Sequence, residues 1–503
     1  MIQMIHSEPR EFHLGNLQRL SIKTGIGYNG CPSIKKSLTK GGNLSSIFQM
    51  QGTLLLINPW IYDFAAYDLW SKPLGLLTLA AGLRRQGYSI RFLDCMDVYH
   101  PLMYRESSLR HPVRRAYGTG KFWRERVPHP SPLQRVPRPY SRYGIRKEVF
   151  LRELGEHPPP AAVLVTSLMT YWYPGVQEVI NLVKTSLPGV PVILGGIYAT
   201  LCRDHALEHS GADHLIPGAG KRAFEELLAL LRKLGIPEGE SFNEAPGFLV
   251  PAFDLMRRLD YVCLSTSSGC PYHCQYCASG YLQPLFLERD RDEILEEILY
   301  WHRDFGVRDF AFYDDALLVH AENRMIPIMD DLVRMGLKIR FHTPNALHVR
   351  EITGEIARLM IRSGFRTIRL GLETSDMELQ DRLGGKVSQG EFERATGHLH
   401  RAGYEKKDIG AYILAGLPGQ SVESVIDTIR FVDSAGAMPY LAEYSPIPHT
   451  ALWEDALNQS EYDLAGEPLY HNNTLWPCWD SNQRERVPEL KGLVREIRHL
   501  TGC

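Results

Sequence analysis

The chain has 503 residues, more than one ordinary domain holds, so two domains of roughly 150–250 residues are expected. Apolar residues make up 44% and charged residues 23%, which excludes a disordered chain, a coiled coil and a collagen-like repeat. The formal charge of -2 gives no overall field that would attract nucleic acid. No apolar run approaches the roughly 18–20 residues that span a bilayer, and no secretory signal is recognised. We therefore expect a soluble cytoplasmic protein.

The first segment, residues 1–50, has no clear period and is expected to be a disordered tail. A strand-like run begins directly after Met50, which makes that residue a candidate for the true start of the protein. Whether residues 1–49 belong to the native protein is left open by the sequence.

Residues 51–240 alternate between short apolar runs and helical runs, as in a doubly wound sheet. This alternation predicts parallel strands with right-handed crossovers, and such sheets bind ligands at the carboxyl ends of their strands. The expected strands are TLLLINP, SIRFLD, AAVLVTS, PVILGG and HLIPG. The expected helices are PLGLLTLAAGLRRQGY, GVQEVINLVKTSL, YATLCRDHALEHSG and KRAFEELLALLRKLG.

A basic insertion, residues 100–148, interrupts this domain. It holds ten Arg and two Lys against three Glu, with prolines and aromatic residues interleaved. Three interpretations stay open: a lid over an anionic ligand, a solvated surface loop, or an RNA-binding segment. In the lid interpretation Lys121 and Trp123 belong to the cover, and several arginines point toward cofactor or substrate: Arg124, Arg126, Arg135, Arg138 and Arg142.

A second α/β domain follows a linker at 241–257 that is rich in Pro and Gly. Six strand-like runs with helices between them occupy residues 258–450, which predicts a partial (β/α)6 barrel of the TIM type, with its chemistry at the carboxyl ends of the strands. The runs are YVCLSTSSGC, DFAFYDDALL, KIRFHTPNAL, TIRLGLET, IGAYILAGLPG and PYLAEYSPIP. Residues 451–503 are expected to form a tail of short helices.

Three of the nine cysteines carry the strongest signal, because Cys270, Cys274 and Cys277 form a C-x3-C-x2-C array directly after the first barrel strand. Three thiolates on one loop can hold three corners of an iron–sulfur cubane and leave its fourth iron open to another ligand. The alternative is zinc, but structural zinc prefers four closed ligands, and His273 is poorly placed between two cysteines on a tight loop. The other six cysteines are scattered and are expected to be ordinary thiols.

The spacing C-x3-C-x-aromatic-C, with Tyr276 as the aromatic residue, resembles the signature of the radical S-adenosylmethionine (SAM) enzymes. The resemblance implies a [4Fe-4S] cluster on the three cysteines, whose open iron binds SAM and whose reduction yields a 5′-deoxyadenosyl radical. It also implies SAM contacts at Tyr276 and at the ends of the second, fourth and fifth strands. The candidates there are Asp314 and Asp315 in FYDDALL, Glu373 in GLET and Gly416 in ILAGLPG.

The first domain resembles the cobalamin-binding domain of one radical SAM subclass, whose elements are D-x-H-x-x-G, S-x-L and GG. Gly195 and Gly196 match the GG element, and VTSLMT, with Thr166 and Ser167, lies in the place of S-x-L. The first element departs from the pattern: after Asp94, the histidine and glycine positions hold Met96 and Tyr99. The resemblance implies bound cobalamin without a histidine below the cobalt, and a fold that binds no corrin is the alternative.

These resemblances predict a radical SAM enzyme that methylates an unactivated carbon with the help of cobalamin. Three alternatives are weighed: a rearrangement or oxidation enzyme whose cobalamin is non-methylating or absent, a methylthiotransferase, and a sensor that is no enzyme. A methylthiotransferase needs a second cysteine triad, but Cys31, Cys95 and Cys202 are widely spread. An electron donor such as flavodoxin or ferredoxin is expected as partner. Neither a membrane nor a nucleic acid is expected as a partner. The sequence does not identify the small-molecule or peptide substrate.

Overall fold

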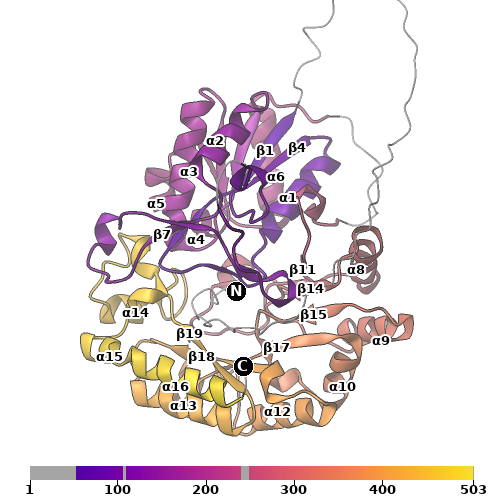
Figure 1. The fold of residues 1–503 in the computed structure, drawn as a ribbon, viewed down its shortest axis with the longest axis vertical. Coiled ribbons are helices and arrows are strands. Elements are labelled where there is room, and N and C mark those ends of the chain that lie inside the picture. The colour runs from indigo at the N-terminus through magenta and orange to yellow at the C-terminus, as the bar shows by residue number, and fades with distance from the viewer. Residues whose placement is uncertain (1–51, 106–108, 240–248, 502–503) are drawn as a thin grey trace, which may run out of the picture.

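We describe the protein from a computed structural model that covers residues 52–105, 109–239 and 249–501. The expected tail at 1–50 and residues 241–248 of the expected linker lie outside the described residues. Two α/β units follow one another along the chain, and Figure 1 shows the first above the second. Within the described ranges, no helix is both long enough and apolar enough to cross a membrane.

The first unit is built on a five-stranded parallel sheet, as its alternating pattern predicts. The strands stand in the order β10-β9-β8-β1-β4, so the chain reverses its direction of travel across the sheet between β1 and β8. In doubly wound sheets such a reversal opens a crevice at the carboxyl ends. The strands are β1 (Thr53–Asn58), β4 (Ser89–Asp94), β8 (Ala162–Val165), β9 (Val192–Gly195) and β10 (His214–Ile216).

Helices cover both faces of this sheet, because successive side chains of a strand point to opposite faces. Leu55 and Ile57 of β1 belong to the core beneath α2 and α3. Leu54 and Leu56 belong to the core beneath α1 and α6 on the other face. These helices are α1 (Leu74–Arg85), α2 (Lys147–Gly155), α3 (Tyr173–Ser186) and α6 (Gly220–Lys233).

One expected helix, YATLCRDHALEHSG, is divided into α4 (Ile197–Leu201) and α5 (Arg203–His209). The break falls at Cys202, whose φ of -123° and ψ of 52° are not helical. In a continuous helix the carbonyl of Leu201 would accept from a residue of the next turn. Here it accepts a hydrogen bond from Nε2 of His449, 3.1 Å away in the second unit. The sequence interpretation of one helix was wrong because this contact comes from a distant segment.

The second unit confirms the six expected strands, which lie in chain order as the parallel sheet of a partial barrel. They are β11 (Val262–Leu264), β14 (Asp309–Phe312), β15 (Arg340–His342), β17 (Phe365–Glu373), β18 (Ile409–Ala415) and β19 (Met438–Glu443). A short additional strand, β16 (Leu347–His348), also pairs with β17.

Helices follow these strands along the outside of the barrel (Figure 1). Several begin at a side-chain cap: Asp290 caps α8, Thr353 caps α10 and Ser421 caps α13, each by accepting hydrogen bonds from main-chain N–H groups of the first turn. The outer helices are α8 (Arg291–Phe305), α9 (Met325–Met335), α10 (Gly354–Ser363), α12 (Glu391–Ala402) and α13 (Val422–Ser434).

The described part of the basic insertion is folded onto the first unit. It forms short antiparallel pairs: β2 (Ile61–Asp63) and β6 (Arg124–Arg126) with β7 (Ser141–Tyr143), and β3 (Tyr67–Asp68) with β5 (Gly120–Lys121). Three of its own aromatic rings, those of Phe122, Tyr140 and Tyr143, are buried. The interleaved aromatic residues therefore anchor a structured segment.

The tail after β19 contains α14 (Trp453–Gln459), α15 (Ser481–Glu485) and α16 (Val487–Leu500), with the 3-10 turns η8 (Pro468–His471) and η9 (Asn473–Leu475) before α15. The yellow ribbon of this tail lies beside β18 and β19 in Figure 1. In the first unit, η8 contacts η4 (Thr170–Trp172), which follows β8. The tail therefore joins the two units.

A second junction is made by the segment between β3 and α1. The indole of Trp70 stacks on the imidazole of His342 at the end of β15, with ring centroids 4.8 Å apart. The Trp70 carbonyl accepts a hydrogen bond from Tyr313, and Asp68 accepts one from Tyr261. Side chains of the first unit thus pack directly on barrel strands.

Candidate functional site

The three motif cysteines lie together on the loop that leaves β11 at its carboxyl end. Cys270, Cys274 and Cys277 are half-buried and form no disulfide. The loop turns at Gly269, whose φ is +73°, and a Cβ there would lie 2.4 Å from the carbonyl oxygen of Leu285. Only glycine suits this position, because other residues would meet both strain and a clash.

Neighbouring loops hold the cysteine loop in place. The N–H of Gln275 donates to the Leu383 carbonyl at 3.1 Å, and the Gln275 carbonyl accepts from the N–H of Leu452 at 3.0 Å. The main chain of His273 lies 3.0 Å from the Cβ position of Gly384. These main-chain contacts fix the loop independently of any bound group.

The thiols influence one another electrostatically, which places them in one neighbourhood. Burial, with further contributions from Asp315, Cys274 and Cys277, raises the pKa of Cys270 to about 11. Burial also raises the pKa of Cys274. Such thiols become thiolates only beside strong positive charge, which a metal centre supplies.

This arrangement fits an iron–sulfur cluster. Among the described residues, no three His, Cys, Asp or Glu side chains converge as ligands of one metal ion. A cubane instead binds each thiolate through a different iron, so its cysteines need not converge on one point.

Two neighbouring carboxylates at the end of β14 have different surroundings. Asp314 is buried and accepts hydrogen bonds from Oγ1 of Thr266 at 2.6 Å and Oγ of Ser267 at 2.7 Å. Its carboxylate therefore binds the segment that leads into the cysteine loop. Asp315 accepts from Oγ of Ser279 at 2.6 Å, two residues after Cys277, and so lies beside the cysteine loop.

Glu373 ends β17 in a buried ion pair that the sequence did not indicate. Its φ is 71°, and a carboxylate oxygen lies 2.7 Å from Nζ of Lys386. Burial lowers the pKa of Lys386, but Glu373 and Cys274 raise it, and the net pKa is raised. Tyr276 is buried beside the same carboxylate, and burial and Glu373 raise its pKa. Lys386 thus lies between Glu373, the carboxylate that is expected to contact SAM, and the cysteine loop.

Two further residues near the cysteines, His348 and Lys386, were not predicted from the sequence. His348, at the end of β16, is buried against the ring of Tyr272, with centroids 4.3 Å apart. Burial lowers the His348 pKa to about 2, so this ring is neutral. Neither His348 nor Lys386 lies in a recognisable motif. Only the packing of the β16 segment and the loop after α11 (Met377–Arg382) brings them to the site.

Gly416 begins the turn after β18 with a φ of +98°. A Cβ there would lie 3.0 Å from the ring of Trp476, and the Gly416 N–H donates to the side-chain oxygen of Gln420 at 3.0 Å. The turn is thus fixed by contacts within the protein, and its carboxyl-end position leaves it a candidate SAM contact.

The candidate cobalamin residues meet where β8 and β9 end. Oγ of Ser167 donates to the Gly195 carbonyl at 2.7 Å, and the Ser167 carbonyl accepts from Ile197 N–H at 2.8 Å. At Gly196, where φ is +93°, a Cβ would lie 2.3 Å from the Ser167 carbonyl oxygen. A Cβ at Gly195 would meet only the Ile216 carbonyl oxygen, at 3.3 Å. Thr166 precedes this cluster and pairs with Ile57 through the main chain.

An apolar cavity lies at the same edge of the sheet, at the crossover point between β1 and β8. It is lined by Trp60, Met96, Phe122, Met169 and Trp172, among others, and histidine is absent from its described lining. A corrin placed at this cavity would meet no histidine among the described lining residues. The cavity encloses about 40 Å3, so its side chains must move apart to admit a corrin. Phe122 belongs to the basic insertion, which therefore reaches the expected site.

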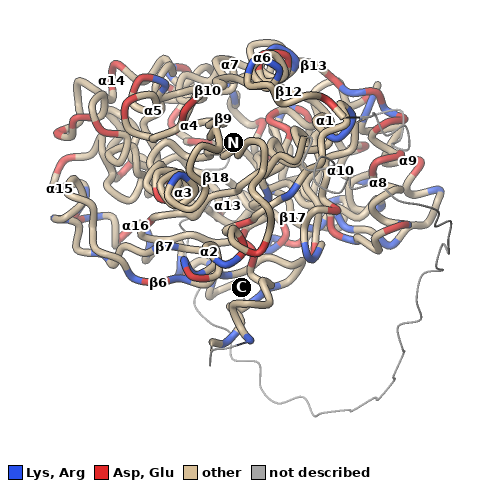
Figure 2. The backbone as a smooth tube through the Cα atoms, turned by 90° about the horizontal axis from the view of Figure 1, so that it is seen from above, with Lys and Arg blue, Asp and Glu red and all other residues tan. Residues whose placement is uncertain are grey.

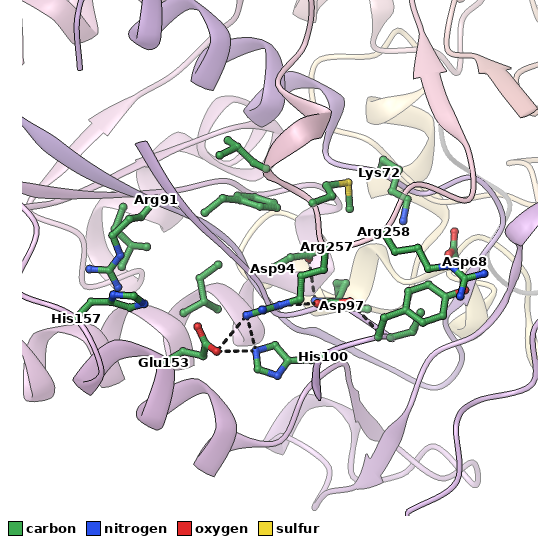
Figure 3. Close-up of a pocket in the computed structure, with 18 residues that line it drawn as sticks. Asp68, Lys72, Arg91, Asp94, Asp97, His100, Glu153, His157, Arg257 and Arg258 are labelled. Carbon is green, nitrogen blue, oxygen red and sulfur yellow. Dashed lines mark hydrogen bonds and ion pairs between the residues drawn. The ribbon is translucent and has the colours of Figure 1, made fainter. Parts of the chain in front are cut away.

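A separate polar pocket of about 250 Å3 borders the edge strand β4 and is drawn in Figure 3. Arg257 bridges it, with Nε 3.3 Å from Asp97 and a terminal nitrogen 3.1 Å from Glu153. Nε2 of His100 lies 3.1 Å from the same Glu153 oxygen. The histidine nearest in sequence to Met96 is thus held in this pocket and does not line the apolar cavity.

The insertion arginines take different positions. Arg142 is buried and pairs with Glu125 at 2.6 Å, while Arg124 and Arg126 are exposed on β6. Arg135 and Arg138 line a large groove beside the tail of the chain. The lid interpretation expects several of these five to point toward cofactor or substrate, and the structure separates them into one buried arginine, two exposed ones and two in the groove.

Comparison with known proteins identifies both units. Residues 264–432 match the family model of the radical SAM superfamily, and residues 140–228 match that of the B12 binding domain. The chain is a radical SAM protein with a B12-binding domain. The first match covers the cysteine loop and most of the barrel, and the second covers β8, β9 and β10.

Relatives of this radical SAM protein include proteins named as methyltransferases. An uncharacterized methyltransferase of Pyrococcus horikoshii is 26% identical over 331 residues, which are 59% of this chain and 70% of the relative. The hopanoid C-3 methylase of Methylococcus capsulatus is 25% identical over 282 residues, 49% of this chain and 53% of the methylase. The chain therefore spans only about half of that methylase.

The same two-unit fold occurs in a solved structure, that of the radical SAM methyltransferase TsrM from Kitasatospora setae with tryptophan and a SAM analogue bound. The TM-score is 0.61, with 16% sequence identity and 89% of each chain covered. This likeness concerns the fold of both units.

Proposed function

We propose that the protein is a cobalamin-dependent radical SAM methyltransferase that acts on an unactivated carbon of its substrate. The observation that supports the proposal is that the carboxyl ends of the strands of both parallel sheets meet within one molecule. The cysteine loop follows β11, and the Ser167–Gly196 cluster follows β8 and β9. His449 contacts α4, the helix that follows Gly196 in the chain, and the ring of Tyr281, which follows Cys277 by four residues.

When bound, the cluster with SAM supplies hydrogen-atom abstraction and cobalamin supplies a methyl group. The protein's own residues bind and orient these groups. We assign Cys270, Cys274 and Cys277 to iron. Tyr276, Asp315, Glu373 and Gly416 are assigned to SAM, with Asp314 as the residue that holds the preceding chain. We assign Thr166, Ser167, Gly195 and Gly196 to the corrin edge.

Exclusion of water is a further requirement, because a reactive site must be shielded from solvent and oxygen. The buried rings of Tyr171 and Trp172 after β8 and the buried turns η8 and η9 fill the junction between the two edges. An electron must still arrive from outside, since radical SAM chemistry begins with a reduction. We propose a flavodoxin or ferredoxin as its donor.

The test is anaerobic reconstitution with iron, sulfide and cobalamin, followed by assay with SAM carrying a deuterated methyl group. Metabolite and peptide fractions are offered as acceptors. We expect both S-adenosylhomocysteine and 5′-deoxyadenosine, together with a product that carries the label. Formation of 5′-deoxyadenosine without S-adenosylhomocysteine would instead support a rearrangement or oxidation and overturn methyl transfer.

A further inference from the structure

A groove of about 1270 Å3 runs beside β19. One wall is formed by residues 131–138 of the insertion, and the other by α16 and the turns before α15. Figure 2 shows β6 and β7 of the insertion on the same side of the molecule as α15 and α16. Small-molecule pockets usually measure about 300–1,000 Å3, so this groove has room for a large ligand.

The groove carries an excess of positive charge. Its two acidic residues are already neutralised: Glu443 lies 2.5 Å from Nζ of Lys491, and Glu461 pairs with Arg484. Within the described part of the chain, no carboxylate forms an ion pair with Arg135, Arg138 or Arg495, three further cations of the lining. These arginines come from both walls, so an anion between them would be held from two sides.

Apolar and aromatic side chains line the same groove. Trp476 lies on its floor, and Nζ of Lys491 lies 5.7 Å from the centre of that ring. The rings of Tyr462 and Tyr470 pack together with centroids 5.0 Å apart. Val494 of α16 adds an aliphatic surface. A ligand with a flat or apolar body beside its anionic group would match this lining.

One part of the groove lining belongs to the segments that form the junction of the two units. Glu443 is the last residue of β19 and is buried, and Thr474 of η9 lies on the same wall. The preceding turn contains His471, whose Nδ1 lies 2.9 Å from Oγ1 of Thr170 after β8. The His471 carbonyl accepts from Ser445, just beyond β19, at 2.5 Å. Two lining residues, Glu443 and Thr474, are thus only two and three positions in sequence from Ser445 and His471 of the segment that links both carboxyl-end edges.

We propose that this groove binds the methyl acceptor as an anion, a carboxylate or phosphate held by Arg135, Arg138 and Arg495 while an apolar or aromatic body lies against Trp476. The identification of the ligand as the acceptor rests on the proposed function. Binding of such an anion in the groove does not.

The test measures binding to the full chain prepared without iron, SAM or cobalamin. Equilibrium dialysis compares 2-naphthyl phosphate, 2-naphthoate and uncharged 2-methoxynaphthalene, so that the two anionic groups are distinguished. We expect at least one anion to bind about tenfold more tightly than the neutral compound. The double variant Arg135→Ser/Arg495→Ser should lose that preference. The matched control Arg334→Ser/Arg430→Ser, at two exposed arginines that do not line the groove, should keep it.

Equal binding of charged and neutral compounds, absence of saturable binding by either anion, or unchanged binding by the double variant would overturn the groove assignment. Because the assay needs no cofactor, a protein that forms no S-adenosylhomocysteine yet binds the anion through these arginines contradicts only the proposed function. A protein that forms S-adenosylhomocysteine but binds neither anion contradicts only the groove.

Discussion

The rings of Tyr281 and His449 stack face to face, with centroids 4.1 Å apart and an interplanar angle of 4°. Tyr281 belongs to α7 (Ser279–Leu282), directly after the cysteine loop, and His449 belongs to the loop after β19. The same histidine donates to the Leu201 carbonyl at the break between α4 and α5. One side chain thus connects the expected cluster site to the helix behind Gly195 and Gly196.

Replacement His449→Ala should loosen this connection without removing a ligand of either cofactor. We expect iron and cobalt contents to stay at the wild-type level while S-adenosylhomocysteine formation falls by about tenfold or more, because small misplacements of reacting groups are costly. The ratio of S-adenosylhomocysteine to 5′-deoxyadenosine, measured by mass spectrometry, reports the effect. An unchanged ratio would show that the contact does not align the two sites.

The cysteine variants Cys270→Ala, Cys274→Ala and Cys277→Ala should each lose the cluster and 5′-deoxyadenosine formation, since three thiolates are the least that holds a cubane here. Iron and sulfide are counted after reconstitution, and circular dichroism checks folding. Cys202→Ala is the matched control, because Cys202 is half-buried but lies outside the loop. Retention of about four irons in the triple variant would refute the assignment.

The two glycines after β9 should respond differently to substitution. Gly196→Ala should lower the melting temperature, because the new Cβ would meet the Ser167 carbonyl at a positive φ. Gly195→Val should leave most of the stability and abolish cobalamin binding, since this position has more room within the protein. Thermal unfolding and the visible spectrum with hydroxocobalamin separate the two effects. Normal corrin binding by Gly195→Val would remove that glycine from the site.

Removal of the Lys386 ammonium should destabilise the barrel, because it leaves the Glu373 carboxylate buried without a cation. For Lys386→Met we expect a loss of about 3–5 kcal/mol in the free energy of unfolding, measured with urea. The double variant Lys386→Met/Glu373→Gln should recover much of it. Lys386→Arg, which keeps the charge, serves as control. A single variant as stable as the wild type would mean that the ion pair contributes nothing to the stability of the barrel.

Asp97, in the pocket of Figure 3, gives a pH test. Burial, with the charge of Asp94, raises its pKa from 3.8 to about 6. The folded state therefore binds this proton more tightly than the unfolded state, so stability falls as pH rises from about 4 to 6. The shift corresponds to about 3 kcal/mol. The difference in unfolding free energy between wild type and Asp97→Asn should change across this range. A difference that does not vary with pH would show that Asp97 titrates normally.

The sequence alone determined the strands of the two parallel sheets and most of the helices between them, in their chain order. Apolar runs of four to six residues between helical stretches predicted both parallel sheets, because strand and helix periods are local properties. The spacing of Cys270, Cys274 and Cys277 predicted the cluster loop, because its ligands are close in the chain. The pair Gly195–Gly196 was recognisable for the same reason.

The tertiary structure decided what depends on residues far apart in the chain. Lys386 reaches Glu373, and His449 reaches Leu201 and divides an expected helix, because loops from separate elements pack together. Asp314 and Asp315 are adjacent and chemically alike, yet one holds Thr266 and the other lies beside the cysteine loop. Arg135 and Arg495 line the same groove only because the insertion packs beside α16. Sequence spacing carries no information about such contacts, since they are set by how complete elements pack.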